Sequence, residues 1–127
     1  MSVELIEALQ NPTLYDHPTK GFRVIETHIS WVILTGPYAY KIKKPVNFGF
    51  LDFSTLEKRA FFCQEELRLN RRLAEDLYLD VVPITGSFTH PKLVAATQLS
   101  SPDSVIEYAL KMTQFDQKGL LARRQET

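Results

Sequence analysis

One acidic residue stands out in the sequence because its position conflicts with its charge. At about 100° per residue, Glu66 falls between Leu73 and Leu77 on the apolar side of a predicted helix. An ionised carboxylate that faces a protein core is costly unless a cation meets it. We therefore expect a lysine or arginine from a neighbouring sheet to contact Glu66. On the helix itself, Arg59 and Asn70 are the competing partners.

We expect Lys41 to be that cation, because a strand pattern places it on the same face as a small residue. Alternation puts Ala39, Lys41 and Lys43 on one face of this strand and Tyr38 and Tyr40 on the other. A small residue two positions before a lysine leaves room for a flat ring to lie over the sheet. The lysine can then reach the phosphates of that ligand.

The two lysines that end this strand have simpler interpretations. Charged residues at a strand end commonly blunt an exposed edge, so we expect Lys43 and Lys44 to be solvated. A second interpretation is a basic, aromatic patch for single-stranded RNA. The tyrosines face away from Lys41 and Lys43, and 15 Lys+Arg balance 15 Asp+Glu, so we expect no nucleic acid partner.

The elements that must position these residues form an α+β pattern. We expect a long helix to begin at Ser54, which has the capping-box spacing to Glu57, and to run to about Ala74. The other expected elements are a helix over 2–10 and strands over 22–29, 31–35, 38–44, 81–85, 93–96 and 105–112. Strands and helices segregate, which predicts an antiparallel sheet with the long helix packed on one face.

Composition excludes several classes of protein. A chain of 127 residues that is 44% hydrophobic and 24% charged is typical of one folded domain. The single cysteine, Cys63, cannot form an internal disulfide, so we expect a reducing, cytoplasmic setting. No apolar run approaches the roughly 20 residues needed to span a bilayer, so we expect no membrane contact. The three histidines lack metal-ligand spacing.

Several runs of residues resemble a known family. The run Tyr38-Ala39-Tyr40-Lys41 resembles the V-A-I-K strand of the protein-kinase-like fold, and the helix that follows resembles the helix whose glutamate pairs with that lysine. The runs Y-K-I-K-K-P, F-G-F-L-D-F-S-T-L-E-K-R and E-E-L-R-L-N-R-R-L resemble, more closely, the aminoglycoside-phosphotransferase-like domain of bacterial predicted kinases. This resemblance covers about residues 4–121. It implies a kinase-like N-terminal lobe over 1–116 and a polar tail over 117–127.

The resemblance implies that the lobe binds ATP with Mg²⁺, and it assigns residues to the phosphate end. Lys41 would hold the α- and β-phosphates, and Glu66 would orient Lys41, with Glu65 as the fallback. The turn between the first two strands contains no glycine, and Ser30 would supply a hydroxyl or N–H to the phosphates instead.

The resemblance also assigns residues to the adenine end. Ala39 would form part of the ceiling over the ring, and Met112 would occupy the gatekeeper position. Backbone groups of Thr113 and Phe115 would bond the edge of the adenine.

The sequence contains no H-x-D catalytic loop, and no later metal-binding aspartate follows a strand. We therefore expect the ATP-binding lobe of a small-molecule phosphotransferase, inactive by itself, whose acceptor the sequence does not identify. Both a truncated gene product and a fragment fit this pattern. A third class is a non-catalytic interaction remnant that self-associates through an exposed hinge side carrying Phe115, Leu120 and Leu121.

Overall fold

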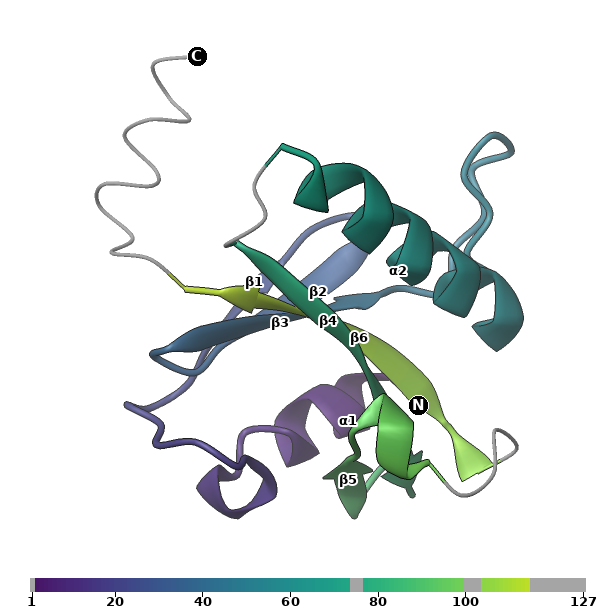
Figure 1. Cartoon of the computed structure of the whole chain (residues 1–127). Coiled ribbons are helices and arrows are strands. Elements are labelled where there is room, and N and C mark those ends of the chain that lie inside the picture. The colour runs from purple at the N-terminus through teal and green to yellow at the C-terminus, as the bar shows by residue number, and fades with distance from the viewer. Residues whose placement is uncertain (1, 74–76, 100–103, 115–127) are drawn as a thin grey trace.

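In the part of the chain that the structure describes, the fold is an antiparallel sheet of six strands with a helix on each face (Figure 1). The computed structural model describes residues 2–73, 77–99 and 104–114. In spatial order the strands are β1 (Arg23–Glu26), β2 (Ser30–Leu34), β3 (Tyr38–Lys43), β6 (Glu107–Thr113), β4 (Tyr78–Gly86) and β5 (Pro91–Leu93). The helices are α1 (Ser2–Ala8) and α2 (Leu56–Arg71), with 3-10 turns η1 (Pro12–Leu14) and η2 (Ala96–Gln98). The predicted α+β class with an antiparallel sheet is confirmed.

The hairpin of β2 and β3 places Lys41 in the middle of the sheet. Its tight turn is closed by Thr35, whose hydroxyl donates to the carbonyl oxygen of Tyr38 at 2.8 Å. Gly36 in this turn has a φ of 113°, a conformation that residues with a Cβ rarely adopt. The register pairs Val32 with Lys41, and β6 completes the other side of β3. The antiparallel arrangement predicted for the sheet is confirmed for the strands expected over 31–35 and 38–44.

The face opposite to Lys41 is covered by α1. Leu5 and Ile6 of this helix, together with Leu9 just after it, pack against Ile33 and Ile42 in one buried core. Removing this apolar surface from water stabilises the packing of α1 on this face of the sheet, because burial is favourable in proportion to apolar area. The other face is thereby left for α2 and for the pocket described below.

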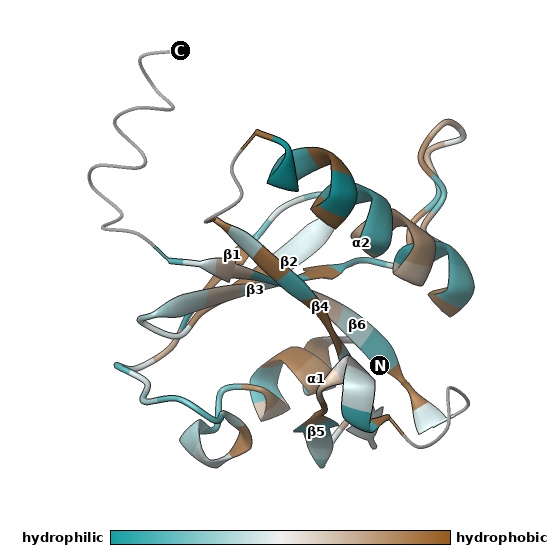
Figure 2. Cartoon of the chain, viewed as in Figure 1, coloured by the Kyte–Doolittle hydropathy of each residue, from teal (hydrophilic) through white to brown (hydrophobic). Residues whose placement is uncertain are grey.

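The second helix, α2, packs mainly over β4 and β6, and Glu66 extends from it to the lysines of β3. Its N-cap is Thr55, whose hydroxyl accepts the backbone N–H of Lys58 at 3.1 Å, so the predicted cap at Ser54 is wrong. The apolar side expected for this helix is also wider than the side that is buried, since Leu69 and Leu73 are 48% and 88% exposed. A helix that contacts two strands buries a narrow stripe. Figure 2 shows hydrophilic and hydrophobic residues mixed along α2.

Several predicted boundaries differ from the structure. The first strand ends at Glu26, and the strand predicted over 93–96 is instead β5, which ends at Leu93 before a 3-10 turn. In the loop before α2, Phe53 is buried, whereas Phe50 is 86% exposed. The long helix ends at Arg71, earlier than the predicted end at about Ala74. Other predictions lie outside the described residues: the adenine contact of Phe115, the tail over 117–127, and Leu120 with Leu121.

None of the helices in the described residues is long and apolar enough to cross a membrane.

Candidate functional site

A pocket of about 650 Å³ opens between α2 and the upper face of the sheet, which is within the usual size range of small-molecule sites. Its floor is apolar and comes from strand residues that share one face, including Ile25, Val32 and Leu34. Six of the predicted site residues line it: Ser30, Ala39, Lys41, Glu66, Met112 and Thr113. The seventh, Phe115, is not among the described residues. The sheet register therefore brings together residues that lie up to 83 positions apart, from Ser30 to Thr113.

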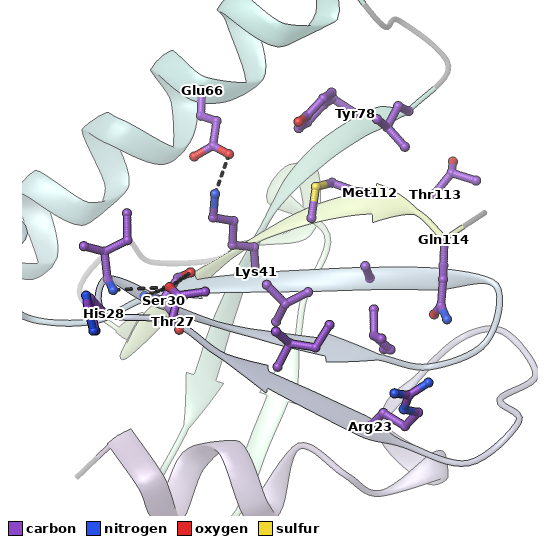
Figure 3. A pocket seen from close by; sticks show the side chains of 16 residues that line it. Arg23, Thr27, His28, Ser30, Lys41, Glu66, Tyr78, Met112, Thr113 and Gln114 are labelled. Atoms are coloured by element: carbon purple, nitrogen blue, oxygen red, sulfur yellow. Dashed lines mark hydrogen bonds and ion pairs between the residues drawn. The ribbon is translucent and has the colours of Figure 1, made fainter. Parts of the chain in front are cut away.

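The predicted ion pair between Lys41 and Glu66 is confirmed. The Nζ atom of Lys41 lies 2.9 Å from Oε2 of Glu66, and the two side chains are 24% and 18% exposed. Lys41 rises from β3 and Glu66 descends from α2, so they meet at the wall of the pocket (Figure 3). Lys41 is thus held in place while its side chain still borders the open space.

A second lysine binds the same carboxylate. The Nζ atom of Lys43 lies 2.7 Å from Oε1 of Glu66 and 5.0 Å from the centre of the Phe53 ring. Lys43 is 5% exposed, so the prediction of a solvated strand end is wrong for this residue. The reason is the two-residue period of the strand, which points both lysines at α2.

Lys44 points elsewhere and is likewise not simply solvated. Its Nζ atom bonds Oε2 of Glu26 at 2.6 Å and lies 5.0 Å from the centre of the Trp31 ring. It does not line the large pocket. Lys44 is therefore a natural control for experiments on Lys41 and Lys43.

The local competitors for Glu66 bind other groups. Arg59 pairs with Glu107 near the start of α2, and the side-chain amide of Asn70 donates to the backbone oxygen of Glu66 at 2.8 Å. Glu65 points outward and pairs with Arg68, so it does not serve as the fallback partner of Lys41.

The charge state of Glu66 follows from its surroundings. Burial raises the pKa of this carboxyl, but the hydrogen bond from Lys43 and the charges of Lys41 and Lys43 outweigh burial. The net result is a pKa below the ordinary value, so Glu66 is ionised at neutral pH. The carboxylate of Glu66 thus joins two lysine cations.

This lowered pKa predicts a pH dependence of stability. Because the folded state binds the Glu66 proton less tightly than the unfolded state, Glu66 stabilises the fold fully above its unfolded pKa of about 4.3. That contribution is lost as the pH falls through the lower, folded value. In urea unfolding, the stability difference between wild type and Glu66→Gln should be large at pH 7 and shrink steadily below about pH 4.3. A difference that stays constant down to about pH 2 would contradict the assigned charge state.

The turn between β1 and β2 borders the cationic end of the pocket. Thr27 closes this turn: its hydroxyl oxygen accepts the backbone N–H groups of Ile29 at 3.3 Å and of Ser30 at 3.0 Å. The hydroxyl groups of Thr27 and Ser30 lie 3.0 Å apart. The N–H of Ser30 is therefore already bonded within the turn, and Ser30 has only its hydroxyl to share. Sequence reasoning missed Thr27 and His28 as lining residues.

The other end of the pocket is formed by the last residues of β6. Met112 lies between Ala39 and Tyr78 in the sheet register. The N–H of Thr113 already donates to the backbone oxygen of Leu77 at 2.8 Å, so it is not available to a ligand. The side-chain oxygen of Gln114 accepts the N–H of Gly36 at 3.0 Å.

Sequence reasoning also missed several lining residues at this end, among them Arg23, Tyr78 and Gln114. Figure 3 shows Gln114 and Arg23 on the side of the pocket away from Thr27 and His28. The cross-strand register from Leu34 to Arg23 and from Met112 to Tyr78 brings two of them here, and that pairing is not readable from local patterns.

The described residues do not fit a magnesium ion. Glu66 is the one acid among those that line the pocket, and each of its oxygens already accepts a bond from a lysine. No group of three or more His, Cys, Asp or Glu side chains that could hold a metal occurs within the described ranges.

Comparison with known proteins gives relatives without a stated function. Uncharacterized proteins of Mycobacterium tuberculosis (strains H37Rv and CDC 1551) and of Mycobacterium bovis are each 42% identical to the chain over 74 residues. The matched stretch is 56% of this chain and 15% of each relative, so the chain spans a small part of their length. No protein-family profile matches the chain, and no solved structure matches it.

Proposed function

We propose that the chain binds ATP in the 650 Å³ pocket and is the nucleotide-binding lobe of a kinase-like, small-molecule phosphotransferase. The observation that carries the proposal is the Lys41–Glu66 ion pair at the wall of a nucleotide-sized pocket. The resemblance of residues 38–73 to the lysine strand and glutamate helix of the protein-kinase-like fold supports it.

The two ends of the pocket differ in chemistry as a nucleotide requires. A flat base fits against the apolar surface of Ala39, Leu34 and Met112, because the small side chain of Ala39 leaves space above the sheet. The phosphates would then lie near Lys41, whose ammonium group is already oriented by Glu66. Orienting the cation beforehand lowers the free energy that ligand binding must spend on ordering it.

Phosphoryl transfer needs a group that accepts the proton of the nucleophile and metal ions that neutralise phosphate charge. The pocket residues supply neither, since Glu66 is bonded to two lysines. Any Mg²⁺ would therefore arrive bound to the phosphates of ATP, and the small-molecule acceptor would bind to residues outside this pocket.

Lys41→Ala provides the direct test. ATP at roughly 100 times its Kd should stabilise the wild type by about 2.7 kcal/mol, a shift of several degrees in Tm. The variant should lose most of this shift, because it removes the cation that meets the phosphates. Thermal denaturation with and without ATP measures the effect, and Lys44→Ala should respond to ATP as the wild type does. A wild type whose Tm does not respond to ATP would refute the proposed function.

Single-stranded RNA is a weaker proposal for the same lysines. Lys43 is buried and Lys44 is bonded to Glu26, so the three basic residues do not form a continuous patch on the surface.

A further inference from the structure

The carboxylate of Glu66 contacts two lysine ammonium groups, one more cation than its single negative charge requires. Lys41 binds Oε2 at 2.9 Å and Lys43 binds Oε1 at 2.7 Å, so this lysine–glutamate–lysine triad has a net charge of about +1. A pair of Lys41 and Glu66 alone would be neutral. The surplus charge therefore depends on Lys43.

We propose that Lys43 is a positioning residue that acts through Glu66 to give the polyphosphate end of the pocket its surplus positive charge. This inference rests on the proposed binding of ATP and names the part of the ligand that the triad recognises. Lys43 does not line the pocket and is 5% exposed, so its effect on a ligand is exerted through the shared carboxylate and through space.

The reason lies in competition for Lys41. A phosphate oxygen that approaches Lys41 competes with Glu66 for the same ammonium group, and it is repelled by the carboxylate. Lys43 occupies the other oxygen of Glu66 and offsets its negative charge, so Lys41 can be shared with the phosphate while Glu66 keeps a partner. In a partly buried site each such charge acts more strongly than it would in water.

The other ionisable groups beside the triad do not change this charge balance. Burial raises the pKa of the Cys63 thiol to about 11, so the thiol is neutral at physiological pH. Glu107, the next acid beyond Cys63, is paired with Arg59 at 3.0 Å. The net charge of the groups bonded to Glu66 therefore comes from Lys41, Glu66 and Lys43.

The test compares Lys43→Met with Lys44→Met, two variants that remove one positive charge from adjacent positions. Isothermal titration should use ATP, inorganic tripolyphosphate and adenosine with each folded protein. Lys43→Met should weaken ATP and tripolyphosphate by at least about tenfold, the effect of one unit charge about 12 Å away at an effective dielectric constant of about 20, and leave adenosine binding unchanged. Lys44→Met should bind all three ligands as the wild type does.

Two further variants separate charge from packing. Lys43→Arg keeps the charge and should retain ATP affinity within about threefold, whereas Lys43→Gln keeps a hydrogen-bond donor and should weaken ATP as Met does. Lys43→Gln also serves if the methionine variant does not fold. Carbon-13 NMR should show the pKa of Glu66 rising in Lys43→Met and Lys43→Gln but not in Lys43→Arg. A purely structural role of Lys43 would not produce this charge-dependent pattern.

The outcomes distinguish this inference from the proposed function. If the wild type binds ATP, and Lys43→Gln binds ATP and tripolyphosphate as tightly as the wild type does, the role of Lys43 is refuted and ATP binding stands. If the wild type binds neither ATP nor tripolyphosphate, both are refuted. Weakening of adenosine together with ATP would show that the variant distorts the pocket, and it would also refute a role confined to the phosphates.

Discussion

Replacing Arg59 with methionine should lower the free energy of unfolding by about 3–5 kcal/mol, the usual cost of removing one partner from a buried ion pair. The Nε atom of Arg59 lies 3.0 Å and 3.2 Å from the two carboxylate oxygens of Glu107, and these residues are 9% and 3% exposed. The Nη1 atom also donates to the backbone oxygen of Phe53 at 2.8 Å. The substitution therefore removes the arginine donor from the Phe53 carbonyl and from the carboxylate, which keeps the backbone N–H of Tyr108 at 3.2 Å.

The pKa of Glu107 explains why this loss is large. Burial raises the pKa of this carboxyl above its ordinary value, even though the charge and hydrogen bond of Arg59 lower it. Without Arg59 the carboxylate would have to be protonated or solvated, and either change costs free energy at neutral pH. The wild-type pair holds the start of α2 against the first residue of β6.

Urea unfolding at pH 7 measures the effect, and the same helix offers a matched control. Arg68→Met removes an exposed arginine that pairs with Glu65, so it should cost less than about 1 kcal/mol. The double variant Arg59→Met, Glu107→Leu should recover much of the loss, because apolar side chains can replace a buried pair. A single Arg59→Met loss as small as that of Arg68→Met would show that the pair is not buried in solution.

The second large effect is expected for Glu66→Ala, which should lower the free energy of unfolding by about 2–4 kcal/mol at pH 7. The substitution leaves Lys41 and Lys43 facing each other without the carboxylate that separates them. Lys43 is 5% exposed, so water cannot easily replace its lost partner. The cost is somewhat below that of a fully buried pair because the Lys41 side chain is 24% exposed.

An added anion should distinguish charge repulsion from lost packing in this variant. Tripolyphosphate should restore part of the stability of Glu66→Ala, because a ligand that binds only the folded state stabilises it by mass action. Glu65→Ala is the neighbouring control, since its carboxylate points outward to Arg68, and it should change stability little. Denaturation of the three proteins with and without tripolyphosphate makes the comparison. Equal stability of Glu66→Ala and Glu65→Ala would contradict the triad.

The central ion pair was predictable from the sequence because both partners obey local periodicity. Glu66 falls on the apolar side of a helix, and Lys41 falls on one face of a strand with Ala39, so the cost of burying a charge requires that they meet. The hairpin of β2 and β3 was predictable for a similar reason, since Gly36 and Pro37 mark its turn.

The surroundings of this pair were not predictable, because they depend on distances between elements. Lys43 has the sequence context of a solvated strand end, and it is buried because α2 crosses the sheet directly above it. Likewise, helix spacing makes Arg59 a competing partner for Glu66, but Arg59 in fact pairs with Glu107, which lies 48 residues away in the sequence. A local pattern states which face a residue occupies but not which residue of another element lies opposite.

The sequence by itself therefore determined the segregation of strands and helices, the faces of β3 and α2, and the requirement that Glu66 receive a cation. Tertiary structure alone decided that two lysines share this carboxylate and that Thr27 closes the turn beside the pocket. It also decided that the N–H of Thr113 donates to the backbone oxygen of Leu77. The physical reason is that periodicity acts over a few residues, whereas ion-pair partners and sheet hydrogen bonds depend on the register between distant strands.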